Sequence, residues 1–304
     1  MFSHFLFFLL FETAQPSYGM FASVLPAEIV TSATAEVTAT APSLQQQNAP
    51  IKKTDSIGPV ISAESVYAID LNGGEPLFTR NVFARRQIAS IAKLVTAMVI
   101  LDNHNVFEKV IVSKNAATQE GSSMFLRSGE EITVENLLTG LLINSGNDAA
   151  TALAEFDAGS ESAFVSKMNA KAALLGLKDT HFSNAKGFDE AGNYSTAFDT
   201  MTFGRAAVSY PFIRKTVALK TAEVMSTDGR ITHSLKSTNE LLENPYFKII
   251  GLKTGTTPEA GQSFVSLTEA PNDHEVLTVV LGSPDRFKET EILLDWVLRN
   301  FEFK

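Results

Sequence analysis

Three short polar motifs occur along the chain in a fixed order, and together they supply the groups needed for acyl transfer on a serine. They are Ser90-Ile91-Ala92-Lys93, Ser145-Gly146-Asn147 and Lys253-Thr254-Gly255. The first motif offers a hydroxyl nucleophile and a lysine base, the second a hydroxyl that can relay a proton, and the third another cation. This combination predicts nucleophilic serine catalysis without a catalytic histidine.

Ser90 and Lys93 lie in an apolar stretch, 90–101, that predicts a helix buried at the centre of a domain. Residues i and i+3 share one helix face, so the lysine amine is expected within hydrogen-bonding distance of the serine hydroxyl. Burial lowers the pKa of a lysine, and so does a nearby cation such as Lys253, which would make Lys93 a usable base. The helix start also offers free backbone N–H groups to a developing oxyanion.

The second and third motifs are expected at a helix end and on a strand. Gly146 should take the sharp turn that points Ser145 and Asn147 one way, after an apolar helical run. Gly255 should let a substrate backbone approach the strand closely, as in strand addition. Lysine and threonine side chains there would suit a terminal carboxylate.

Each motif also has copies elsewhere in the chain. Ser183 to Lys186 is a second S-x-x-K string, but it lies in a polar stretch and not in an apolar helix. Ser113 to Asn115 and Ser237 to Asn239 repeat the S-x-N pattern. We interpret all three copies as structural or incidental.

The composition indicates a globular protein and excludes several functions. The chain has 304 residues, of which 44% are hydrophobic and 19% charged, with a formal net charge of -9 and no basic stripe, so nucleic acid is not an expected partner. It contains no cysteine, which excludes disulfides and thiolate sites. Its five histidines are scattered without metal-ligand spacing. No metal or cofactor is expected.

The first 56 residues do not look like part of the folded domain. An apolar run over 5–11 has the size of a signal-peptide core and is far shorter than the roughly 20 residues that span a bilayer. We therefore interpret 1–27 as a signal peptide or N-terminal anchor, although no lysine or arginine precedes Lys52. Residues 28–56 form an Ala/Thr/Ser-rich linker, and 57–304 the catalytic domain.

Within that domain the patterns predict a strand hairpin, a helical centre, three strands and a final helix. Because the connections are short, the N- and C-terminal strands are expected to share one antiparallel sheet. Thr133 and Ser160 are expected to cap helices, and Thr196 with Asp199 resembles a capping box. The strands are expected at 66–71, 75–79, 247–252, 263–268 and 275–281, and the helices over 134–143, 160–176, 201–210 and 289–301.

With their flanking residues, the motifs resemble the serine-type D-alanyl-D-alanine carboxypeptidases, the low-molecular-mass penicillin-binding proteins of peptidase family S11. The resemblance extends from about residue 66 to 301 and includes Asn144-Ser145-Gly146-Asn147-Asp148, Thr180-His181-Phe182 and Gly251-Leu252-Lys253-Thr254-Gly255. It implies an α+β fold of the β-lactamase/penicillin-binding transpeptidase type, with a five-stranded antiparallel sheet packed with helices and a helical subdomain.

The resemblance also implies a role for each motif. Ser90 would attack the penultimate D-alanine carbonyl of a peptidoglycan stem pentapeptide (D-Ala-D-Ala), giving an acyl-enzyme that water releases. Lys93 would take the serine proton, Ser145 would pass a proton to the departing D-alanine, and Asn147 would hold the peptide. The oxyanion would bind the N–H groups of Ser90 and Thr256. The other substrate-binding residues would be Lys253, Thr254, Gly255, Thr256 and Arg286.

Further expectations follow from the family. β-Lactam antibiotics should act as covalent inhibitors that acylate Ser90. Export is expected, to the periplasm or cell surface. Many members carry a second strand-rich domain and a C-terminal amphipathic anchor, neither of which appears in this sequence, so membrane association is expected through the N-terminus. Thr256 stands where some relatives have histidine, which would change rate or pH dependence.

Four other readings use some of the same residues. A D,D-endopeptidase acting on cross-links would need the same machinery and a different cleft. A class A β-lactamase would need an E-x-x-L-N loop, and none occurs between Asn147 and Lys253. A catalytically silent wall-binding homologue would not need Ser90 and Lys93 intact. A conventional Ser-His-Asp hydrolase would need a G-x-S-x-G elbow, which is missing.

Overall fold

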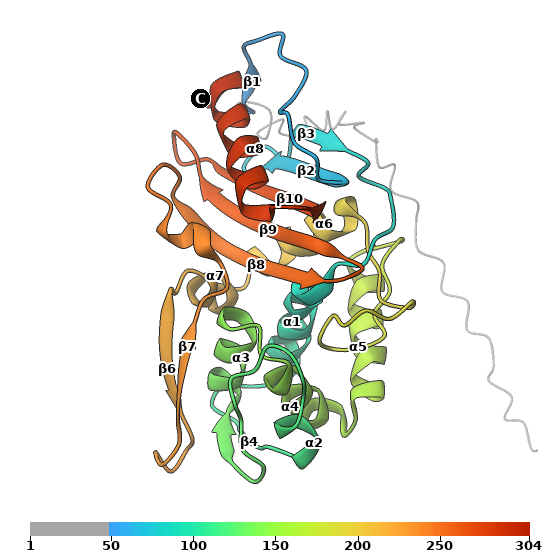
Figure 1. The fold of residues 1–304 in the computed structure, drawn as a ribbon, viewed down its shortest axis with the longest axis vertical. Helices are drawn as coiled ribbons and strands as arrows, with labels where there is room; N and C mark the ends of the chain where they lie inside the picture. The colour runs from blue at the N-terminus through green and yellow to red at the C-terminus, as the bar shows by residue number, and fades with distance from the viewer. Residues whose placement is uncertain (1–48) are drawn as a thin grey trace, which may run out of the picture. The chain divides into compact units, whose positions relative to one another are not determined.

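The computed structural model describes residues 49–304 (Figure 1). Its centre is an antiparallel sheet of five strands in the order β3-β2-β10-β9-β8. The strands of the N-terminal hairpin and the three C-terminal strands therefore share one sheet, as predicted, because β2 pairs with β10. The strands are β2 (Ser65–Asp70), β3 (Pro76–Arg80), β8 (Ile249–Thr257), β9 (Gly261–Glu269) and β10 (Glu275–Ser283).

Both faces of the sheet are covered by helices, which explains why its central strands are buried along most of their length. Helix α8 (Arg286–Asn300) packs on β9 and β10, and α6 (Ala197–Val208) packs on β2 and β10 on the opposite face. Successive side chains of β10 alternate between two cores. Val276 joins the core that contains Leu293 of α8, whereas Leu277 joins the core that contains Phe203 of α6.

The helical part packs around α1 (Lys93–Asn103), which is buried along most of its length and contacts all its larger neighbours (Figure 1). The predicted helix over 90–101 begins as a short 3-10 turn, η1 (Ala89–Ala92), so Ser90 lies in η1 and Lys93 opens α1. The helices that contact α1 are α6 and the three helices α3 (Val134–Ile143), α4 (Asn147–Ala158) and α5 (Glu161–Leu174). Two shorter helices lie further out, α2 (Lys114–Ala117) against α4 and α7 (Pro211–Val217) against α3.

The predicted helix caps are confirmed, with one difference. Thr133 and Ser160 accept hydrogen bonds from the backbone at the starts of α3 and α5. Thr196 Oγ1 accepts from Asp199 N at 3.0 Å, which is half of a capping box. The Asp199 carboxylate does not return to Thr196 but accepts from Thr180 Oγ1 and Asp179 N, both at 2.8 Å.

Two small two-stranded sheets were not predicted. One pairs β4 (Lys109–Ile111) with β5 (Glu131–Thr133), across a connection that includes α2, and the other is the hairpin of β6 (Thr221–Met225) and β7 (Thr232–Lys236), beside α3 in Figure 1. Their strands are short and expose every second residue, so they lack a long apolar run. They are linked at His233, whose Nε2 lies 2.7 Å from Glu130 Oε1 in a buried pair.

The folded structure includes residues before 57, the predicted start of the catalytic domain. Strand β1 (Ile51–Lys52) pairs with β11 (Phe301–Glu302) after α8. The indole of Trp296 also donates to Ser56 Oγ at 2.7 Å. Main-chain pairing needs no apolar pattern, which is why the composition of 51–56 did not reveal it.

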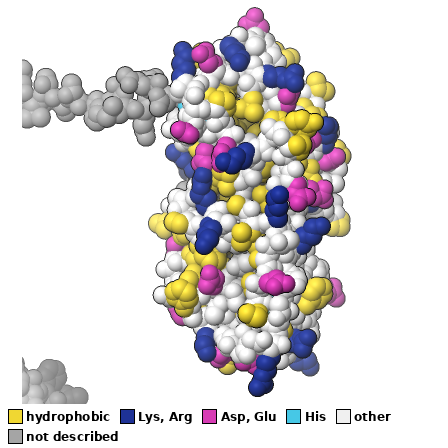
Figure 2. All heavy atoms as spheres, turned by 90° about the vertical axis from the view of Figure 1, so that its left-hand side faces the viewer, with side chains coloured by type: hydrophobic (Ala, Val, Ile, Leu, Met, Phe, Trp, Pro, Cys, Tyr) yellow, Lys and Arg dark blue, Asp and Glu magenta, His cyan; other side chains and the backbone are white. Residues whose placement is uncertain are grey.

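The predictions for 1–48, including the signal peptide or anchor and most of the linker, lie outside the described residues. Over residues 49–304 no helix has the length and apolar character to span a bilayer. Lysine, arginine and acidic side chains are interspersed over the face shown in Figure 2.

Candidate active site

Lys93 lies at the centre of the site, and its amine is surrounded by three oxygen atoms. Nζ is 2.7 Å from Ser90 Oγ, which confirms the predicted serine and lysine pair. It is also 2.8 Å from Asn147 Oδ1 and 2.8 Å from the carbonyl oxygen of Lys186. An ammonium can donate to all three, whereas a neutral amine donates to two and accepts from the Ser90 hydroxyl.

The surroundings of Lys93 favour its neutral form. The side chain is 0% exposed, and this burial is the main reason why its pKa lies well below the ordinary lysine value. The positive charges of Lys253 and Lys186 lower this pKa further, while Asp148 opposes them. Lys253 is also buried, and burial together with Arg286 lowers its pKa to about 7. Both causes that were predicted to lower the Lys93 pKa, burial and a nearby cation, are therefore present, and the role of Lys93 as a base stays a prediction.

Two glycines allow other segments to contact the backbone around Ser90. A Cβ added to Gly187 would lie 2.0 Å from the Ala89 carbonyl oxygen. A Cβ added to Gly255 would lie 2.8 Å from the Ile88 carbonyl oxygen and 3.2 Å from Ser90 N. Gly255 was predicted to admit a substrate backbone. In the structure its missing side chain already admits the backbone of η1.

The turn before α4 differs from the prediction in one respect. The left-handed backbone conformation falls on Ser145, with φ of 60°, and not on Gly146, with φ of -57°. Gly146 is required for space instead, because a Cβ there would lie 2.8 Å from Asp148 Oδ1. Ala89, directly before Ser90, is another of the six non-glycine residues with positive φ among residues 49–304, at 49°. Such conformations are uncommon and concentrate at functional sites.

The two polar residues of this turn are both buried, but their contacts differ. Asn147 accepts from Lys93, and its Nδ2 donates to the Glu120 carbonyl oxygen at 2.6 Å. Its amide therefore positions Lys93 in this structure, and its role in holding a peptide stays a prediction. Among residues 49–304 no hydrogen bond joins the Ser145 hydroxyl to Ser90 or Lys93, so its role as a proton relay also stays a prediction.

Asp148 organises the loop that faces α4, a role that the motifs did not suggest. It is 1% exposed, and its carboxylate accepts from Ser123 Oγ at 2.6 Å and from the backbone N–H groups of Met124 and Leu126, each at 3.1 Å. The sequence feature that could have pointed to Asp148 is its position directly after Ser145-Gly146-Asn147. Backbone donors on a buried carboxylate fix this loop beside the site.

The predicted carboxylate-binding residues meet along the end of β8. Arg286, at the start of α8, donates through Nη1 to the Gly255 carbonyl oxygen at 3.1 Å and to Thr256 Oγ1. Lys253 Nζ donates to the Thr254 carbonyl oxygen at 3.0 Å. Thr254 is buried, and its hydroxyl lies 2.6 Å from that of Thr238. The structure thus groups these residues beside Ser90, and what they bind stays a prediction.

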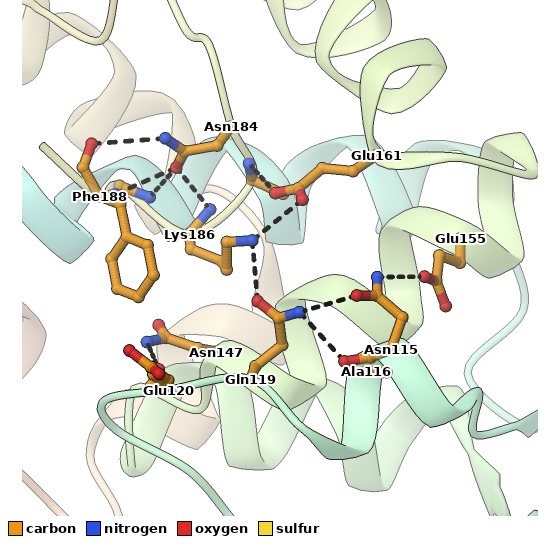
Figure 3. Close-up of polar contacts among 12 residues, drawn as sticks. Asn115, Ala116, Gln119, Glu120, Asn147, Glu155, Glu161, Asn184, Lys186 and Phe188 are labelled. Atoms are coloured by element: carbon orange, nitrogen blue, oxygen red, sulfur yellow. Dashed lines mark hydrogen bonds and ion pairs between the residues drawn. The ribbon is translucent and has the colours of Figure 1, made fainter. Parts of the chain in front are cut away.

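The segment 184–188 is part of the site, although the S-x-x-K string within it was interpreted as incidental. Ser183 and Lys186 do not form a second nucleophile and base, because Lys186 Nζ bonds instead to Glu161 Oε2 at 2.9 Å and Gln119 Oε1 at 3.0 Å (Figure 3). The backbone of Lys186 is what reaches Lys93. A sequence motif is defined by side-chain types, so it could not predict that the carbonyl oxygen of Lys186 contacts Lys93.

Comparison with known proteins identifies close relatives. A family model described as D-alanyl-D-alanine carboxypeptidase matches residues 51–285. The chain is 35% identical over 248 residues to the D-alanyl-D-alanine carboxypeptidase DacF of Bacillus subtilis, covering 79% of this chain and 63% of the relative. It is 34% identical over 259 residues to DacA of Escherichia coli, covering 80% and 62%. The chain therefore spans less than two thirds of the length of these curated relatives.

A solved structure shows the same fold. The crystal structure of the Streptomyces K15 DD-transpeptidase superposes with a TM-score of 0.74 at 32% identity, covering 80% of this chain and 100% of that chain. The fold is that of the penicillin-binding DD-transpeptidases, as predicted.

Proposed function

The chain belongs to the D-alanyl-D-alanine carboxypeptidase family, and we propose on this basis that it removes the terminal D-alanine from peptidoglycan stem pentapeptides through an acyl-enzyme on Ser90. The observation that supports this most directly is the 2.7 Å contact between Lys93 Nζ and Ser90 Oγ, with Lys93 fully buried. A neutral lysine in this position can remove the serine proton as the hydroxyl attacks.

In the acylation step, Ser90 Oγ bonds to the carbonyl carbon of the penultimate D-alanine while its proton moves to Lys93 Nζ. The carbonyl oxygen becomes an oxyanion, which the N–H groups of Ser90 and Thr256 would stabilise. The contact between Gly255 and Ser90 N supports this arrangement, because it places β8 beside the nucleophile. Collapse of the intermediate breaks the C–N bond.

The leaving D-alanine needs a proton on its nitrogen, and Ser145 would pass it on from Lys93. Water then attacks the acyl-enzyme, with Lys93 again accepting a proton, and Ser90 is released. The supporting observation for Ser145 is that its buried hydroxyl lies two residues from Asn147, which contacts Lys93 directly.

The terminal carboxylate of the substrate would bind at the end of β8. Lys253, Thr254 and Arg286 supply two cations and a hydroxyl there, and Thr256 contributes through its contact with Arg286. Asn147 would hold the peptide on the other side. A substrate in extended form could pair its main chain with β8, as in β-strand addition.

The same chemistry makes β-lactams covalent inhibitors, because their strained amide would acylate Ser90. A peptidoglycan substrate supports a location outside the cytoplasm, in the periplasm or at the cell surface. Membrane association would then come from the N-terminal residues.

A second candidate is transfer of the acyl group to an amine instead of water. It is favoured by the match to the solved structure named DD-transpeptidase, because the match covers 100% of that protein's chain. Both reactions share the acyl-enzyme and differ only in the acceptor.

One experiment tests the proposal. Wild type, Ser90→Ala and Ser183→Ala are incubated with fluorescent penicillin and, separately, with a pentapeptide ending in D-Ala-D-Ala. We expect covalent labelling and D-alanine release from wild type and Ser183→Ala, and neither from Ser90→Ala. The Ser183 variant is the matched control, since it removes the hydroxyl of the other S-x-x-K string.

The outcomes separate the candidates. Added glycine that is incorporated into the product would favour the transpeptidase. Labelling without D-alanine release, together with cleavage of cross-linked dimers, would indicate an endopeptidase. A wild type that is neither labelled nor active would refute the proposed function.

A further inference from the structure

We propose that Lys186 is a positioning residue for the base Lys93, acting through an ion pair with Glu161 that fixes the segment 184–188. This inference rests on the proposed function, in which Lys93 accepts the proton of Ser90. It concerns the side chain of Lys186, whereas the contact with Lys93 is made by the Lys186 backbone.

The Lys186 side chain is anchored in a nearly buried position. Its Nζ lies 2.9 Å from Glu161 Oε2 and 3.0 Å from Gln119 Oε1 (Figure 3), and the side chain is 9% exposed. The ring of Phe188 lies 5.6 Å from Nζ. An ion pair shielded in this way is screened less by water and salt than one on the surface.

The same carboxylate also holds the backbone of the segment. Glu161 Oε1 accepts from Ala185 N at 3.0 Å, while its other oxygen binds Lys186 Nζ. Asn184 Oδ1 accepts from the N–H groups of Lys186, Gly187 and Phe188, at 3.2, 2.7 and 3.0 Å. The direction of the Lys186 carbonyl group toward Lys93 is therefore set by contacts on both sides.

Lys186 also ties this segment to the second group that holds Lys93. Gln119, which binds Lys186 Nζ, precedes Glu120, whose carbonyl oxygen accepts from Asn147 Nδ2. Asn147 Oδ1 in turn accepts from Lys93. Apart from Ser90 Oγ, the amine of Lys93 is thus held by two oxygens: the carbonyl oxygen of Lys186 itself, and Asn147 Oδ1, which Lys186 Nζ reaches indirectly through Gln119 and the neighbouring Glu120 (Figure 3).

The charge of Lys186 adds an effect that packing alone would not give. The charged groups acting on Lys93 are Lys253 from β8, Lys186 from its loop and Asp148 from α4, and both lysines lower the Lys93 pKa. Glu161 is the partner that compensates the charge of Lys186. Removing the ammonium should therefore raise the pKa of Lys93 in addition to loosening its position.

The test measures the second-order rate of acylation by fluorescent penicillin between about pH 5 and pH 10, where the acid limb reports the base. In Lys186→Met we expect the rate at neutral pH to fall by about tenfold or more, because small displacements of reacting groups cost this much. We also expect its acid limb to move to higher pH. In Glu161→Gln we expect a similar fall in the acylation rate. Its acid limb should not move to higher pH, because the loss of a negative charge does not raise the Lys93 pKa.

The matched control is Lys167→Met, which breaks a 2.7 Å ion pair between a lysine of α5 and Asp157. It should keep the wild-type rate and pH profile. A lowered rate in Lys186→Met with an unmoved acid limb, or a rate equal to wild type at every pH, would overturn the inference. If Lys186→Met does not fold, the near-isosteric Glu161→Gln decides: an unchanged rate refutes the inference. A wild type that penicillin does not acylate refutes the proposed function itself.

Discussion

Gly187 lies against Ala89 so closely that a Cβ on Gly187 would be 2.0 Å from the Ala89 carbonyl oxygen. The loop that carries the Lys186 carbonyl group and the turn that carries Ser90 are therefore in direct main-chain contact. Any side chain at this position must push one of them away.

We expect Gly187→Ala to reduce acylation by penicillin by on the order of 100-fold, because Ser90 and Lys93 would separate. Gly129→Ala is the matched control: the two φ values are 83° and 84°, but nothing lies within 4 Å of a Cβ at Gly129. It should cost about 1 kcal/mol in stability and leave the rate unchanged. Equal rates in both variants would show that the close contact is not needed.

Much of the fold could be predicted because it depends on apolar patterning. The run over 90–101 is apolar on all sides since α1 is enclosed by helices, and β10 is mostly apolar since helices cover both faces of the sheet. The hairpin of β6 and β7 was missed because only alternate residues are buried. Asp228-Gly229 between its strands was an available turn signal.

The contacts that side chains make in the candidate site could be predicted from the sequence, whereas the contacts and conformations of its backbone could not. The spacing of Ser90 and Lys93 predicted their contact, and apolar surroundings predicted the burial of Lys93. The Lys186 carbonyl group, and the left-handed conformation of Ser145 in place of Gly146, depend on tertiary contacts. No local pattern of residue types encodes them.

The rate of acylation should depend on pH through two lysines. It should rise with pH as Lys93 loses its proton, and fall again as Lys253, whose pKa is about 7, loses the charge that would bind a carboxylate. In Lys253→Met we expect a lower rate, no alkaline limb near pH 7, and an acid limb at higher pH. Lys248→Met, at an exposed ion pair with Glu269, is the control. An alkaline limb that persists in Lys253→Met would contradict this assignment.

Stability should also depend on pH through Lys253. Its pKa is about 7 in the folded protein and roughly 10.4 when unfolded, so between these values the unfolded chain binds more protons. The free energy of unfolding should therefore increase with pH across this window, by on the order of 4 kcal/mol for this residue. Urea unfolding at several pH values should show a smaller increase for Lys253→Met than for wild type. If the free energy of unfolding changed with pH equally in wild type and Lys253→Met, the pKa of Lys253 in the folded protein would be that of an ordinary lysine.

Residues 49–56 should contribute to stability although they were predicted as linker. A chain starting at residue 57 loses β1, the Lys53 N to Asn300 O bond at 2.9 Å, and the Ser56 partner of the Trp296 indole. We expect it to be about 1–3 kcal/mol less stable than a chain starting at residue 49. Trp296 is the only tryptophan, so its fluorescence should report the change. Equal stability of the two chains would restore the boundary at residue 57.

Within residues 49–304, strand β8 pairs only with β9, so its other edge carries main-chain groups without a strand partner. An edge of this kind usually invites association between copies of a protein, and ultimately aggregation. Here η1 and α7 pack against β8, and Gly255 contacts the turn of the nucleophile. We expect this packing to exclude the broad sheet of a second copy while a single extended peptide can still pair. The same neighbours that build the reaction centre would then protect the protein from self-association.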